Sequence, residues 1–196
     1  MKVLKQYSED LSNKVAGFES LPMELNVGDI SGYGLTLNID VNTPAASVFT
    51  TDGLTNLCVD VAHGLTTGLK GQVTTTGVLP TGISAVTDYY IIAGSTDTYY
   101  LATSLVNALA GTYITISDAG TGNHTFTPTA LAGGSYQLKV SIDGLNYVPL
   151  AAATNITADA EVFADEVDPL YNWVKVVYTL TAGRMSVVQR VIVKGE

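Results

Sequence analysis

The side chains best suited to chemistry are a lone thiol and a nearby imidazole, Cys58 and His63. A thiol becomes a nucleophile when an imidazole takes its proton, and Asp60 could orient that imidazole. Three residues so close in one strand do not naturally face one another, and a free cysteine in an alternating apolar run is usually a small core residue. We therefore interpret Cys58 as structural, and we predict no catalytic residue, no cofactor and no enzymatic activity.

An acidic segment near the C-terminal end offers the second candidate site. Hard cations such as Ca²⁺ take several oxygen ligands from one loop, so its carboxylates are candidate calcium ligands. Their spacing matches no EF-hand, and a solvated acidic loop explains them better. Paired carboxylates could also hydrolyse a glycoside, but the sequence shows no aromatic-lined cleft to hold sugar. The residues are Asp159, Glu161, Asp165, Glu166 and Asp168.

Tyrosine is the third unusual residue, with eleven copies that include the pairs Tyr89–Tyr90 and Tyr99–Tyr100. Neighbours in a strand point to opposite faces, so each pair is predicted to place one ring in a core and the other outside. Exposed tyrosines are common at interfaces, because the ring buries a large area with little loss of entropy.

The composition restricts the classes of partner that the chain could bind. The chain has 196 residues, a formal net charge of -9 and 46% hydrophobic residues, so it is expected to fold. Nine cations against eighteen acids disfavour binding to nucleic acid. No apolar stretch reaches the ~20 residues of a membrane span, and no membrane partner is predicted. The single cysteine excludes an internal disulfide.

The elements that carry these residues fall into two groups. Residues 41–134 hold one basic residue, Lys70, and no glutamate or arginine. Short alternating runs separated by glycine are typical of antiparallel strands and tight turns. We predict a small Ig-like or barrel-like domain over residues 49–134, inserted into an outer domain of residues 29–48 and 135–196. Domain insertion of this kind is tolerated at exposed loop tips.

The strands of the outer domain can be recognised by their alternation. Residues 33–41 and 136–142 alternate with a period of two, and we expect them to be halves of one hairpin, interrupted by the insert. Residues 173–180 and 185–193 are β-branched runs, and the loop between them, which contains Gly183, predicts a second hairpin. The predicted fold class is all-β: an antiparallel, jelly-roll-like sandwich with an inserted domain.

The first segment, residues 1–28, is predicted to be an N-terminal arm, because its apolar residues show only a weak helical spacing. Arms with a few apolar anchors commonly order on a partner. The interface candidates are the apolar and aromatic residues of this arm: Leu4, Tyr7, Leu11, Val15 and Phe18.

Several runs resemble a small β module that recurs in virion proteins of tailed bacteriophages. They are residues 63–68 (HGLTTG), 73–83 (VTTTGVLPTGI), 88–92 (DYYII), 99–104 (YYLATS) and 118–122 (DAGTG). The outer runs 140–147 (VSIDGLNY) and 173–179 (WVKVVYT) are similar to a β-sandwich of capsid-associated and tail-associated phage proteins.

This resemblance implies a non-enzymatic building block of a phage particle, located in the virion after assembly in the host cytoplasm. The first expectation is an auxiliary capsid protein that decorates or cements the shell, with the major capsid protein or other virion proteins as partners. A tail or head-to-tail connector component is the alternative, and a virion-displayed module that binds host-surface glycans is the third. Homo-oligomeric assembly is expected, because a neighbour that binds only the folded state stabilises it.

Overall fold

The computed structural model describes residues 2–25, 30–41, 43–130, 133–167 and 170–195. The chain forms two compact units. Unit 1 consists of residues 1–42 and 131–196, and unit 2 consists of residues 43–130. The fold is all-β and antiparallel, as predicted.

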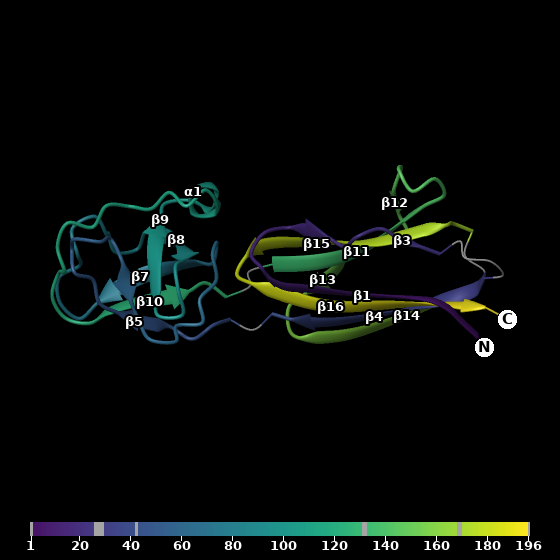
Figure 1. Cartoon of the computed structure of the whole chain (residues 1–196), viewed down its shortest axis with the longest axis horizontal. Coiled ribbons are helices and arrows are strands. Elements are labelled where there is room, and N and C mark those ends of the chain that lie inside the picture. Colours follow the sequence, from purple (N-terminus) through teal and green to yellow (C-terminus); the bar gives the residue numbers. More distant parts are fainter. Residues whose placement is uncertain (1, 26–29, 42, 131–132, 168–169, 196) are drawn as a thin grey trace. The chain divides into compact units, whose positions relative to one another are not determined.

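Unit 1 is a sandwich of two antiparallel sheets, seen as two layers in Figure 1. The first sheet has the order β1 (Lys2–Lys14), β16 (Met185–Gly195), β4 (Ile30–Asp40) and β14 (Ala160–Val167). The second has the order β12 (Val148–Pro149), β11 (Gly133–Ser141), β15 (Trp173–Ala182) and β2 (Phe18–Glu19), while β13 (Thr154–Ile156) pairs with β11 and β3 (Met23–Glu24) pairs with β15.

The core of unit 1 lies between these sheets, because the strands alternate buried and exposed residues. In β4, Tyr33, Leu35, Leu37 and Ile39 are buried. They share one cluster with alternating residues of β15 and β16, among them Val174, Val176, Tyr178, Val187, Val191 and Val193. Burial of large aliphatic side chains at about 1.5–3 kcal/mol each is the main stabilising contribution to such a core.

The strands that flank the insert do not form the predicted hairpin. β4 pairs with β14 and β16, whereas β11 pairs with β12, β13 and β15 in the other sheet. The second predicted hairpin is wrong for the same reason, since β15 and β16 also lie in different sheets. A period of two shows that one face of a strand is buried, but a strand that crosses to the opposite sheet has the same pattern as one that turns back beside its neighbour.

The N-terminal arm is also corrected by the structure. Residues 2–14 form β1, an edge strand hydrogen-bonded along β16. Of the interface candidates, Leu11 is buried, and Leu4, Tyr7 and Phe18 pack against the core of unit 1, with Phe18 stacked on Tyr178 at 4.6 Å. Val15 is half-buried after the end of β1. These side chains serve the chain's own sandwich rather than an arm that waits for a partner.

Unit 2 is a six-stranded sheet that closes on itself. Its order is β5 (Ser47–Phe49), β10 (His124–Pro128), β7 (Lys70–Thr75), β8 (Asp88–Ala93), β9 (Thr98–Ala102) and β6 (Cys58–Val59). Thr50, directly after β5, exchanges both backbone hydrogen bonds with Val59 of β6, at 3.1 and 2.9 Å. The last strand therefore returns to the first, and this closure leaves unit 2 barrel-like.

The only helix of the described chain is α1 (Leu105–Leu109), which lies in unit 2. The Ser104 hydroxyl caps it by accepting a hydrogen bond from the Asn107 amide at 3.1 Å. No helix among the described residues has the length and apolar character needed to cross a membrane.

Candidate interaction site

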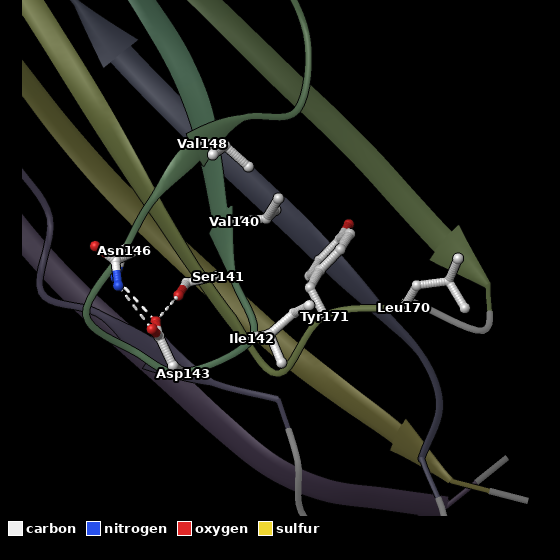
Figure 2. A pocket seen from close by; sticks show the side chains of 8 residues that line it. All are labelled: Val140, Ser141, Ile142, Asp143, Asn146, Val148, Leu170 and Tyr171. Atoms are coloured by element: carbon white, nitrogen blue, oxygen red, sulfur yellow. Dashed lines mark hydrogen bonds between the residues drawn. The ribbon is translucent and has the colours of Figure 1, made fainter.

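Unit 1 has a hollow of about 360 Å³ beside the turn after β11 (Figure 2). The end of β11 and the turn provide one part of its lining, β12 a second, and the segment before β15 a third. The residues are Val140, Ser141, Ile142, Asp143, Asn146, Val148, Leu170 and Tyr171.

The turn is held in shape by the Asp143 carboxylate. Its oxygens accept hydrogen bonds from the backbone amides of Leu145 and Asn146 at 2.9 and 2.8 Å, from the Asn146 side-chain amide at 2.8 Å, and from the Ser141 hydroxyl at 2.8 Å. Gly144 has a φ of 74°, and a Cβ there would lie 3.0 Å from the Trp173 ring. Aspartate supplies the acceptor for the turn's donors, and the following glycine adopts the positive φ without placing a Cβ against Trp173.

The polar side chains in the lining already have partners inside the chain. The four donors around Asp143 lower the pKa of its carboxyl well below the usual range. The Tyr171 hydroxyl lies 3.0 Å from that of Tyr33. Since these groups are engaged, the hollow offers a visiting ligand mainly apolar walls, which suits aliphatic or aromatic side chains of a protein.

Large apolar residues around the hollow are exposed, although most such residues in unit 1 are buried in its core. Leu170 is 93% exposed, and the four further members of the set lie in or beside the turn and β12. Contiguous exposed apolar patches commonly mark protein-binding surfaces, whereas single exposed residues need no explanation. The set, called here the apolar rim, is Ile142, Leu145, Val148, Leu150 and Leu170.

Acid is expected to destabilise unit 1 through Asp143. A carboxyl whose folded-state pKa lies below its unfolded value, near 3.8, stabilises the fold above that pH and loses its contribution as pH falls further. Asp143→Asn should therefore reduce the difference in stability between pH 7 and pH 3. Trp173, the single tryptophan, packs on this turn and reports the unfolding of unit 1 by its fluorescence. Equal acid dependence in the wild type and the variant would contradict this assignment.

The thiol and imidazole that could have formed a nucleophilic pair have structural roles. Cys58 is fully buried, and burial raises the pKa of its thiol, which keeps it protonated. The His63 Nδ1 accepts a hydrogen bond from the Leu65 amide at 2.9 Å, and its Nε2 lies 3.0 Å from the Ser95 carbonyl oxygen. The interpretation of Cys58 as a core residue is confirmed.

The acidic segment forms an edge strand rather than a loop. Glu161 lies in β14 and is exposed, and Asp159 accepts a hydrogen bond from the Val41 amide at 2.9 Å. Asp168 lies outside the described residues, as do the side chains of Asp165 and Glu166, whose backbones pair with Gly34 and Tyr33. Among the described residues, no group of three or more acidic, histidine or cysteine side chains is placed to hold a metal.

The tyrosine pairs behave as predicted. Tyr89 and Tyr99 are buried in unit 2, and their neighbours Tyr90 and Tyr100 lie on the outer face at intermediate exposure. The Tyr99 hydroxyl lies 3.1 Å from that of Ser47 in the core, and burial raises the pKa of the Tyr99 hydroxyl.

The sequence predicts the turn at residues 143–146 but not the hollow beside it. The available signal was the run of leucine, isoleucine and valine in and around that turn, where polar residues are usual.

Comparisons with known proteins add little to this geometry. The chain matches no protein-family model, and no curated protein matches it. Among solved structures it is similar to VP17, a capsid protein of bacteriophage P23-77, with 9% sequence identity and a TM-score of 0.19, over 99% of this chain and 100% of that one. A TM-score this low carries no structural argument. Fold and surface thus define an all-β protein of two units, with an exposed apolar hollow on the sandwich.

Proposed function

We propose that the chain is a non-enzymatic structural component of a bacteriophage particle, an auxiliary protein that decorates the capsid by binding the major capsid shell. The sequence resemblance to phage virion modules supports the class. The observation that carries the binding role is the apolar rim around the hollow, where the lining polar groups are already engaged. Covering such a surface with another protein removes apolar area from water, which lowers the free energy.

The local chemistry favours binding over turnover. Catalysis needs titratable groups that converge on a cleft with pKa values matched to proton transfer. Here the Asp143 carboxylate is saturated by donors, and the Cys58 thiol is buried in the core of unit 2. Both groups shape their surroundings instead of facing a substrate.

The experiment that tests the proposal compares two single charge insertions. Leu170→Asp places a charge in the rim, where burial against a partner would cost several kcal/mol. We expect it to weaken binding to shells assembled without this chain at least tenfold in co-sedimentation. Leu54→Asp is the matched control, because Leu54 is 87% exposed in unit 2 and lies outside the hollow. Equal binding by both variants, or no binding of the wild type to shells, would contradict the proposal.

Copy number separates the decoration role from a tail or connector role. Saturation at hundreds of copies per particle supports decoration of the shell, whereas a dozen or fewer, bound to tails, supports the connector alternative.

One observation favours a glycan-binding role for unit 2 as a second candidate. Tyr113 is 47% exposed and stacks on Tyr100 with ring centroids 4.5 Å apart, so its outer surface is held in a fixed orientation. Sugars commonly stack on such rings. Trp173 is a poorer platform, because the turn at Gly144 lies against its ring. A glycan-array signal that Tyr113→Ala abolishes would support this role, and a flat response would remove it.

A further inference from the structure

The first sheet of unit 1 has two open edges, formed by β1 and β14. The described residues pair β1 only with β16, and β14 only with β4. Edge strands present backbone donors and acceptors that can pair with another chain. Both edges contain uninterrupted stretches: β14 pairs without a bulge from Ala160 to Val167, and β1 pairs without a bulge from Lys5 to Leu11.

The direction of the strands suits addition of a second copy. The sheet has four strands and every neighbouring pair is antiparallel, so β1 and β14 run in opposite directions. A copy in the same orientation, placed beside β14, therefore presents its β1 antiparallel to that strand. Strand direction therefore keeps alternating across the contact between the two copies, which is the geometry that antiparallel hydrogen bonding requires.

Charge selects which edges meet. β14 contains Glu161, Asp165 and Glu166 and no cation, whereas β1 contains three lysines and two acids. Pairing two copies of β14 about the strand centre would set Glu161 opposite Asp165 or Glu166, and like charges in opposed positions are destabilising. Pairing β14 with β1 joins a segment of formal charge -3 to one of +1, obtained as three lysines minus two acids.

The core-facing residues limit the register to alternate positions, and Val162 opposite Tyr7 is one of these. Val162 of β14 and Tyr7 of β1 both pack against the core of unit 1, so they must lie on the same face of a continued sheet. Setting Val162 opposite Tyr7 places Ala160 opposite Glu9, Glu161 opposite Ser8, Phe163 opposite Gln6 and Ala164 opposite Lys5. No like charges meet in this stretch. Phe163, which is 70% exposed, would gain a cross-strand neighbour on the outer face.

We propose that copies of this chain add edge to edge, β14 of one to β1 of the next, with Val162 opposite Tyr7. Because the two edges differ, the contact is heterologous, and successive copies form a ring or an open chain of sandwiches. This inference goes beyond the binding of a shell protein at the hollow and uses different residues. Loss of one interaction therefore leaves the other measurable.

Cysteine cross-linking of the full chain tests both the edges and the register. Directly opposed residues in an antiparallel pair have Cα atoms ~4.5–5.5 Å apart, within the range of a disulfide. Within one copy, β1 and β14 are separated by three strand spacings, ~14 Å, which a disulfide cannot span. The variant Gln6→Cys/Phe163→Cys is therefore expected to give a ladder of covalent oligomers in a glutathione redox buffer. Both positions are exposed, so folding is preserved.

The single variants provide the controls. A mixture of Gln6→Cys and Phe163→Cys chains, one carrying a mass tag, should give mixed dimers in at least tenfold excess over either homodimer. The native thiol, Cys58, is buried and stays out of the reaction. A double variant that remains monomeric, or a predominance of Phe163→Cys homodimers, would overturn the proposal.

Discussion

Gly82→Ala is expected to unfold much of unit 2, with a loss of about 2–5 kcal/mol in its free energy of unfolding. Gly82 has a φ of 105°, and the Ile83 amide donates to the Pro80 carbonyl at 3.0 Å, so glycine occupies the turn position that needs positive φ. A Cβ at this position would lie 2.0 Å from the Thr115 carbonyl oxygen. Backbone strain and steric overlap therefore act together.

Gly64→Ala separates these two contributions. Gly64 also has a positive φ, 60°, but a Cβ there would meet nothing within 4 Å. Its loss should be about 1–2 kcal/mol, from the backbone conformation alone. Calorimetry gives the transition of unit 2, and the fluorescence of Trp173 follows unit 1 as an internal reference. Equal losses for the two variants would show that the contact with Thr115 is relieved at little cost.

The sequence was informative where each strand buries one face. The alternation in residues 33–41 predicted β4, and its odd-numbered residues from Tyr33 to Ile39 are buried. Alternation does not predict β1, because a polar residue, Glu9, occupies an inward position in that strand. The Glu9 carboxylate accepts hydrogen bonds from the Leu21 amide at 3.0 Å and from the Gln189 side chain at 2.9 Å. A buried partner for Glu9 cannot be seen in local spacing, and the weak helical spacing of the apolar residues predicts an arm instead of a strand.

The candidate site could also be predicted from the sequence only in part. The turn at residues 143–146 was predicted because aspartate, glycine and asparagine have local conformational preferences that act within four residues. The hollow also needs Leu170 and Tyr171, which reach it from the segment before β15. That meeting depends on which sheet each strand joins, and the alternation of a strand does not specify its sheet.

A buried polar chain connects the two sheets where the second hairpin was expected. The Tyr178 hydroxyl of β15 donates to the Gln189 Oε1 of β16 at 3.0 Å, and the Gln189 Nε2 donates to the Glu9 carboxylate of β1. Gln189 is only 1% exposed, so an unmade hydrogen bond here carries the full cost of desolvation. The bond between Tyr178 and Gln189 joins strands of opposite sheets, and the bond between Gln189 and Glu9 extends it to the neighbouring strand β1. A wrong pairing of β15 with β16 would leave these polar groups unsatisfied.

Tyr178→Phe and Gln189→Leu are each expected to reduce the stability of unit 1 by about 1–3 kcal/mol, because each leaves a buried polar atom without its partner. The double variant removes both partners and should lose less than the sum of the single losses, with a coupling energy of about 0.5–3 kcal/mol. Urea unfolding followed by Trp173 fluorescence measures all four states of this cycle. Additive losses, within about 0.5 kcal/mol, would mean that the hydroxyl and the amide stabilise the sandwich independently, and that packing rather than this hydrogen bond holds β15 over β16.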